Sequence, residues 1–272
     1  MLTPTARQFS PIATRLGRWF ACVLCLSFAY SISAQSTETL TPTQLEIHKQ
    51  RARLNSSSEE DRRDALMRLG AMHLSEASRA ALPGLTDVSP MVRVIAVRAI
   101  LSLSPAESVQ ALVPLLGDKD EFVRRETSYA LGLTRSKDAI APLVDHLLKD
   151  KEDGVRGAAA VALGQIGDEN AVVSLATVLT GQAKRKGKQE QNEFVLRAVA
   201  EALGLIRSRA GAPALIAALN NEKLSSDIRR EAARGLGLIG DPSSVAALNQ
   251  AIMSPDPYLS AAAYEALKKI SH

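Results

Sequence analysis

The feature that most constrains this chain is an internal repeat of about 31 residues. Helix-like stretches ending in variants of Ala-Leu-Gly recur, and a marked position lies eight residues before the glycine or its equivalent. Repeats of this length are supersecondary units that can bury a hydrophobic face only against their neighbours. The chain is therefore expected to form a stack of similar units. The marked positions, spaced by 31, 31, 32, 40, 33 and 31 residues, are Arg62, Arg93, Arg124, Arg156, Leu196, Arg229 and Ser260.

Each copy contains two amphipathic stretches. Residues 123–133 and 139–148, for example, place apolar side chains three and four positions apart, which is the period of one helix face. Neither stretch alternates apolar and polar residues as a half-buried strand does. Gly167 and Gly240 follow first stretches, where a left-handed residue is expected to end the helix. The sequence thus predicts an all-α fold built from helix, tight turn, helix and short loop.

The repeated pattern of Asp, five residues, Arg and then Ala-Leu-Gly resembles HEAT repeats, especially the short bacterial kind also found in phycobilisome lyases. The resemblance covers residues 59–272 and implies a right-handed α–α superhelix, a solenoid of about seven helical hairpins. It also implies that the Asp before each first helix and the Arg within it form a structural ladder through the stack. It carries little about function, since such repeats serve many unrelated tasks. The motif pairs are Asp87 with Arg93, Asp118 with Arg124, and Asp150 with Arg156.

A structural role for the arginines fits their chemistry. A guanidinium has five donors in a fixed fork, so it can bind one carboxylate through two bonds and still reach a carbonyl. The marked position lacks arginine at Leu196 and Ser260, and Lys223 stands six residues before Arg229 where the pattern has Asp. Coupling between repeats is therefore expected to be weaker in the C-terminal half. Four further aspartates are expected to cap the starts of first helices, namely Asp120, Asp153, Asp227 and Asp256.

The N-terminal 34 residues have the composition of a secretory signal. They contain Arg7, Arg15 and Arg18 but no Asp or Glu, and an apolar run at 19–34 ends in small residues. Cleavage after Ala34 would leave a periplasmic or secreted protein with no integral membrane span. An uncleaved segment, which would tether the chain to a membrane, remains the alternative. Residues 35–58 are expected to form a linker and an N-terminal capping helix at 43–54.

The charge balance argues against nucleic-acid binding. The whole chain has 33 basic and 29 acidic residues, and removal of the three N-terminal arginines leaves 30 against 29. A nucleic-acid-binding protein usually keeps a basic stripe. Both cysteines, Cys22 and Cys25, lie in the expected signal, so disulfides and thiolate metal sites are excluded from the mature chain.

No motif predicts catalysis. Residues 235–240, GLGLIG, match the dinucleotide-binding pattern GxGxxG, but a helical stretch precedes them where that site needs a strand. None of the four histidines is followed by Glu, which argues against HExxH sites and the His-Glu pairs of HEAT-type di-iron hydroxylases. We therefore expect a protein that is not an enzyme and that has no catalytic residue, metal or cofactor.

Two surfaces are candidates for binding a protein or peptide partner. The stretched interval contains GQAKRKGKQEQNE at 181–193, a basic loop suited to an acidic partner, although a merely solvated insertion is the alternative. In the family that the chain resembles, second helices line the concave side, which implies a mixed polar groove. The candidate residues are Lys184, Arg185, Lys186 and Lys188 in the loop, and Gln110, Asp145, His146 and Lys149 in the groove.

These features together predict an exported, monomeric scaffold that binds another protein through its groove, its basic loop or both. Two alternatives stay open at this point. The repeat subtype suggests a lyase-like enzyme or chaperone that handles a tetrapyrrole or similar ligand. Retention of the N-terminal segment would instead make the chain a membrane-tethered regulator.

Overall fold

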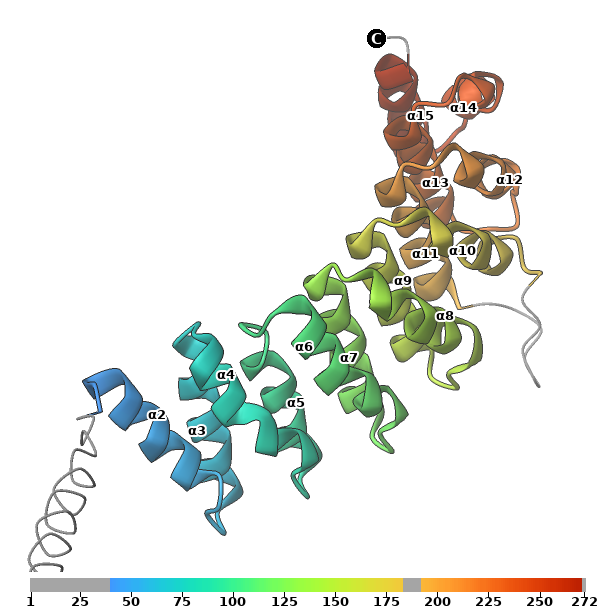
Figure 1. Cartoon of the computed structure of the whole chain (residues 1–272). Helices are drawn as coiled ribbons and strands as arrows, with labels where there is room; N and C mark the ends of the chain where they lie inside the picture. The colour runs from blue at the N-terminus through green and yellow to red at the C-terminus, as the bar shows by residue number, and fades with distance from the viewer. Residues whose placement is uncertain (1–39, 183–191, 271–272) are drawn as a thin grey trace, which may run out of the picture. The chain divides into compact units, whose positions relative to one another are not determined.

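A computed structural model describes residues 40–182 and 192–270, and over these ranges the chain consists of helices joined by turns, with no strand. The expected signal peptide at 1–34 and the basic cluster at 184–188 lie outside the described residues. Successive hairpins lie side by side in chain order (Figure 1). The expected all-α superhelical repeat fold is confirmed.

The first helices of the repeats form one layer of the stack. Each contacts the first helix of the following repeat along its length. They are α3 (Glu59–Ala71), α5 (Pro90–Ala99), α7 (Glu121–Thr134), α9 (Asp153–Ile166), α11 (Glu193–Ile206), α13 (Ser226–Ile239) and α15 (Pro257–Ile270).

The second helices are shorter and form the other layer. Six repeats contain one within the described residues, and the seventh copy contributes only α15, so the structure has six complete hairpins where about seven were expected. They are α4 (Ser75–Ala81), α6 (Pro105–Leu112), α8 (Ile140–Lys149), α10 (Val172–Leu179), α12 (Ala212–Asn220) and α14 (Val245–Ile252).

Each second helix is joined to a short 3₁₀ segment, whose position changes along the chain. In the first two repeats it follows the helix, where Pro83 and Pro114 lack the N–H that would continue the α-helical bonding. In the other four repeats it precedes the helix. The segments are η1 (Leu82–Thr86), η2 (Val113–Gly117), η3 (Lys137–Ala139), η4 (Glu169–Ala171), η5 (Arg209–Gly211) and η6 (Pro242–Ser244).

A helix before the first repeat, α2 (Pro42–Arg53), lies within one residue of the expected capping helix at 43–54. Its Ile47 and Gln50 are buried, and Arg53 binds both Asp61 (3.0 Å) and Asp64 of α3. The helix therefore covers α3, the first helix of the first repeat.

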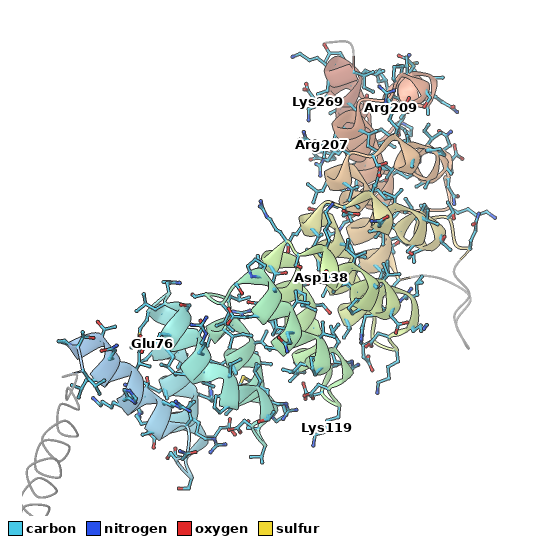
Figure 2. All side chains as sticks on the ribbon, in the orientation of Figure 1. Glu76, Lys119, Asp138, Arg207, Arg209 and Lys269 are labelled. Carbon is cyan, nitrogen blue, oxygen red and sulfur yellow. The ribbon has the colours of Figure 1, made fainter. Side chains whose placement is uncertain are left out.

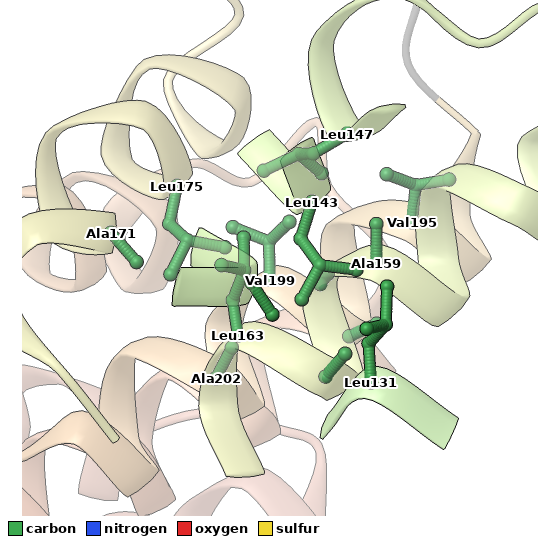
Figure 3. Close-up of a cluster of buried hydrophobic side chains, with 14 of the residues drawn as sticks. Leu131, Leu143, Leu147, Ala159, Leu163, Ala171, Leu175, Val195, Val199 and Ala202 are labelled. Atoms are coloured by element: carbon green, nitrogen blue, oxygen red, sulfur yellow. The ribbon is translucent and has the colours of Figure 1, made fainter. Parts of the chain in front are cut away.

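One hydrophobic core runs between the two layers. Figure 3 shows a part of it in which apolar side chains from α7, α8, α9, α10 and α11 meet. Leu131, Leu163 and Val199 come from three successive first helices, while Leu143 and Leu175 come from the second helices that face them. All five are fully buried. Each repeat therefore completes its core only with side chains from the next.

First helices approach one another closely because small residues meet at a repeated position. The glycine of the Ala-Leu-Gly pattern packs on Ala or Gly of the next first helix, and a Cβ added at Gly164 would lie 2.8 Å from Ala202 Cα. In the second repeat Leu101 takes this position, and α5 ends before it at Ala99. The contacts are Gly70 with Ala99, Gly132 with Ala162, Gly164 with Ala202, Gly204 with Gly235, and Gly237 with Ala266.

Left-handed residues end several first helices. Gly167 (φ 74°) and Gly240 (φ 71°) do so as expected, because glycine has no Cβ to oppose a positive φ. Arg135 and Arg207 take the same conformation without being glycine, at φ 52° and 57°. The sequence carried no signal for these two helix ends.

The close contacts between first helices can be tested with two glycines of α9. Gly164→Ala should lower the free energy of unfolding by about 1 to 3 kcal/mol, because the added methyl would press on the Ala202 backbone. Gly154→Ala should stabilise the protein by about 0.5 kcal/mol, because the nearest atom to its new Cβ is Arg125 Cδ at 3.7 Å. Urea unfolding of both variants measures the contrast. If both variants changed the free energy of unfolding equally, the close approach of the α9 and α11 backbones would not be what requires glycine at position 164.

Candidate functional site

Three arginine–aspartate clamps join successive repeats in the front half of the stack. In each, Nε and Nη2 of an arginine donate to the two oxygens of an Asp carboxylate 25 or 26 residues later, in the next repeat. The distances are 2.7 and 3.0 Å for Arg62 with Asp87, 2.7 and 2.7 Å for Arg93 with Asp118, and 2.8 and 3.1 Å for Arg124 with Asp150. The clamps therefore connect the repeats directly.

The clamp pairing differs from the pairing within the sequence motif. Arg93 shares a motif with Asp87, yet its Nη1 reaches only the backbone carbonyl of Asp87, at 2.8 Å, while its carboxylate partner is Asp118. Arg124 repeats the arrangement one repeat later, with its Nη1 2.9 Å from the carbonyl of Asp118. Arg93 and Arg124 thus each bind a backbone carbonyl in the loop before their own helix and the Asp side chain in the next loop. The ladder is therefore continuous from one joint to the next.

Each clamp aspartate also shapes the loop that carries it. One carboxylate oxygen accepts the backbone N–H two residues ahead, at 2.9 Å, from Ser89, Asp120 and Glu152 respectively. This bond fixes the turn just before the next first helix begins. The same carboxylate therefore forms the turn and receives the clamp.

Because the clamps are buried, each charged side chain depends on its partner, and not on water, for stabilisation. All six side chains are 11% exposed or less. Burial alone would raise the pKa of Asp150, but hydrogen bonds from His146, Arg124 and the Glu152 N–H outweigh it and lower this pKa. The pKa values of Asp87 and Asp118 are lowered in the same way, with burial opposed by the arginine and by the N–H at the turn.

Arg156 departs from the clamp geometry although it belongs to the same motif. It is fully buried, its Nε donates to the carbonyl of Leu147 at 2.9 Å, and its Nη1 lies 3.3 Å from Asp153. Arg229 makes an equivalent bond, from Nε to the carbonyl of Leu219 at 2.9 Å. These two arginines bind the last turn of the preceding second helix, α8 or α12.

The joint between the fifth and sixth repeats has lost both members of the clamp. Leu196 stands at the arginine position, and Asn221, 25 residues later, takes the aspartate position, where its side chain accepts the N–H of Lys223 at 3.1 Å; the expected alignment of Lys223 with the aspartate is therefore wrong. Leu196 and Asn221 line a cavity of about 370 Å³ between α11 and α13. The structure therefore has open space at a joint where the charge pair is missing, in the half of the stack where weaker coupling is expected.

The predicted groove residues are partly occupied by contacts of their own. His146 is half-buried and its Nδ1 lies 3.3 Å from Asp150, so it belongs to the third clamp and not to an open surface. Asp145 and Lys149 are exposed and form an ion pair along α8, and Gln110 is exposed on α6. Lys184, Arg185, Lys186 and Lys188 lie outside the described residues.

Two of the four expected helix caps are present. Asp120 caps α7 by accepting the N–H groups of Phe122 and Val123, and Asp256 accepts the N–H of Tyr258 at the start of α15. Asp153 and Asp227 lie inside the first turns of their helices, so the expectation for them is wrong. The neighbouring residues Glu152 and Ser225 take the extended cap conformation in their place.

Exposed ion pairs between repeats form a second set of links, which lie outside the expected ladder. They are weaker, because at least one member of each is open to solvent. A basic residue and an acidic residue 28 to 31 positions later would have been the signal. The pairs are Arg79 with Glu107, Arg98 with Glu126, and Lys137 with Asp168.

Charged side chains of both signs are spread along the stack (Figure 2). Glu76 lies on α4, Lys119 precedes α7, and Arg207 and Arg209 flank the turn into α12. Across residues 40–182 and 192–270 no three His, Cys, Asp or Glu side chains gather as metal ligands would. No helix in these ranges is long and apolar enough to span a membrane.

Removal of the third clamp should destabilise the protein more than removal of an exposed link. Arg124→Ala leaves the buried Asp150 without its main partner, and we expect a loss of about 3 kcal/mol in the free energy of unfolding. Arg79→Ala is the matched control, because Arg79 also links two repeats but is 54% exposed. Its urea midpoint should stay near that of the unmodified chain. An unchanged midpoint for Arg124→Ala would contradict a structural role.

The lowered pKa values of the clamp carboxyl groups predict that the folded protein loses stability at acid pH. An unfolded Asp titrates near about 3.9, and the clamp aspartates titrate lower when folded. Their contribution to stability is therefore present above about pH 4 and is lost as the pH falls through the folded pKa values. Urea midpoints at pH 7, 5 and 3 should drop at the lowest pH. The Asp150→Asn variant should have a lower urea midpoint than the unmodified chain at pH 7 and a smaller drop in that midpoint at pH 3. If both proteins lose the same amount between pH 7 and pH 3, Asp150 is not a source of the acid sensitivity.

Models of known protein families match the repeats of this chain. The family model of HEAT repeats matches residues 49–128, 78–164, 123–190 and 222–272, and that of the PBS lyase HEAT-like repeat matches 195–221. A search of curated sequences gave no significant match.

Solved structures with TM-scores above 0.5 share the fold at low sequence identity. Escherichia coli YibA is 19% identical with a TM-score of 0.57, over 84% of this chain and 82% of its own. An engineered protein is 22% identical with a TM-score of 0.51, over 83% and 68%. The CpcE–CpcF complex of phycocyanin lyase from Nostoc sp. PCC7120 is 23% identical with a TM-score of 0.49, over 87% and 89%. The family matches span most of the stack, and the chain belongs to the HEAT repeat family.

Proposed function

We propose that this chain is a non-catalytic scaffold that binds a protein or peptide partner in an extracytoplasmic compartment. The observation that carries the proposal is a preformed surface of exposed side chains on the second helices, held by a stack with one continuous hydrophobic core. HEAT repeats commonly mediate protein interactions. A surface that is already ordered loses little conformational entropy on binding.

The exposed side chains on the second helices suit a protein partner. This second-helix surface combines amide and charged groups with apolar area. Val173 is 75% exposed beside a mainly apolar cleft of about 360 Å³ between α10 and α12. Mixed surfaces of this kind are typical of protein interfaces. The surface comprises Gln110, Asp145, Lys149, Val173, Asn220 and Gln250.

Export is the part of the proposal that depends on the N-terminal segment. The basic start, the apolar run and the small residues before Ala34 support cleavage and release as a monomer. The basic loop at 181–193 supports an acidic partner as a second contact. The intact mass of the protein from a soluble extracytoplasmic fraction tests cleavage.

One observation favours a second function. The match of residues 195–221 to the PBS lyase HEAT-like repeat supports handling of a tetrapyrrole or similar ligand. Titration of the mature protein with such a pigment tests it. Saturable visible absorbance would favour the ligand-handling function over the scaffold.

Site-specific photocrosslinking tests the scaffold function. A photoreactive amino acid at Gln110 or Gln250 should give discrete crosslinks to a partner in the native extract, because both positions are exposed on second helices. The same group at Met67 or Tyr264, which are exposed on first helices, should not. Crosslinks only from the first-helix positions would place the partner on the other layer and contradict the proposed surface.

A further inference from the structure

The last joint of the stack keeps its arginine but lacks the matching carboxylate. Arg229 occupies the clamp position of the sixth repeat, and the residue 25 positions later, where Arg62 and Arg93 find Asp87 and Asp118, is Ser254. The Ser254 hydroxyl still accepts the N–H two residues ahead, from Asp256 at 3.2 Å. Serine therefore replaces aspartate in shaping the turn but provides no charge for the clamp.

The guanidinium of Arg229 is consequently available for binding. Its Nε donates to the Leu219 carbonyl, and within residues 40–182 and 192–270 the guanidinium forms no ion pair with a carboxylate. Arg229 lines a cleft of about 500 Å³ between the sixth and seventh repeats. The cleft thus contains a half-buried cation that lacks the partner its equivalents have.

We propose that this cleft binds an Asp or Glu side chain of a partner peptide, which takes the place of the missing clamp carboxylate. The inference rests on the proposed scaffold function and identifies one of its contact points. The chain itself supplies the precedent, since at three equivalent joints the arginine binds a carboxylate presented by a short turn. Because the Nε of Arg229 donates to the Leu219 carbonyl, the carboxylate would bind Nη1 and Nη2, and such a bidentate pair gives directional specificity.

The surroundings of Arg229 define which peptide fits. Met253 is 83% exposed and lines the cleft together with Pro255, so apolar residues beside the carboxylate gain contact. Glu222 and Asp256 also line it and would repel a run of acidic residues. Asp256 does not replace the missing partner, because its carboxylate caps α15, as Asp120 caps α7 beside the intact clamp of Arg93. The occupant is therefore a peptide with a single carboxylate and neutral neighbours.

The chain offers a suitable probe in its own first clamp loop. The peptide GLTDVSP copies residues 84–90, has one carboxylate, and would be blocked at both ends. Titration into ¹⁵N-labelled full chain should give a saturable shift of the Arg229 Nε–Hε resonance. The Asp→Asn peptide should bind at least about tenfold more weakly, because it removes a charge-assisted hydrogen bond.

Three variants separate the cleft from general effects. Arg229→Gln should weaken peptide binding at least about tenfold, whereas Arg234→Gln, an exposed arginine of the same helix that pairs with Glu231, should not. Ser254→Asp should abolish binding, because the internal carboxylate then fills the clamp, and should raise the Tm by about 2 °C or more. The last variant keeps the test valid if Arg229→Gln folds poorly.

Several outcomes would overturn the inference. These are equal binding of the Asn peptide, unchanged binding to Ser254→Asp, an affinity for acetate that matches the peptide, or self-association of the chain through this cleft. Crosslinks from Gln110 with no peptide binding would leave the scaffold function standing and remove only this site. Peptide binding without crosslinks would support the Arg229 cleft and contradict the proposed second-helix surface.

Discussion

The front half of the stack depends on one repeated contact, a buried arginine that binds the backbone of its own loop and the carboxylate of the next. A hairpin cannot bury its apolar face alone, and hydrophobic contact by itself does not define how neighbouring hairpins align. The clamp adds direction, because a planar guanidinium donates two hydrogen bonds to a carboxylate only in a narrow geometry. Arg62, Arg93 and Arg124 repeat the same bonds with nearly the same distances, so three successive joints share one geometry.

Close packing of small residues complements the clamps. Gly164 against Ala202 and Gly204 against Gly235 bring first-helix backbones together, while the clamps hold the loops at the ends of those helices. From the fourth repeat onward these small-residue contacts continue, although Arg156 and Arg229 bind helix carbonyls. The C-terminal half therefore relies more on packing, and its joints contain the open space that a charge pair fills elsewhere.

In the proposed function, the change in the joints would link stability to binding. A clamp satisfied within the chain offers nothing to a partner, whereas a joint with an unpaired arginine can accept a group from outside. The second-helix surface and the Arg229 cleft both use the ordered stack as a support. Binding at either place would require little rearrangement, since the surrounding helices are already packed.

The sequence by itself determined the repeat period, the all-α class, the capping helix and five of the six expected ladder residues, because periodicity and residue type are local properties. The sixth, Arg156, donates instead to the Leu147 carbonyl. The sequence could not determine which aspartate each arginine binds, because Asp87 is six residues from Arg93 in the motif yet receives the side chain of Arg62. Nor could it reveal that His146 contacts Asp150, that Arg156 turns to Leu147, or that Arg135 takes a left-handed conformation. Only the tertiary structure decided these points. The clamp partners are 25 or 26 residues apart and meet only when one repeat packs on the next, and the shorter-range contacts depend on how the helices and loops around them are placed.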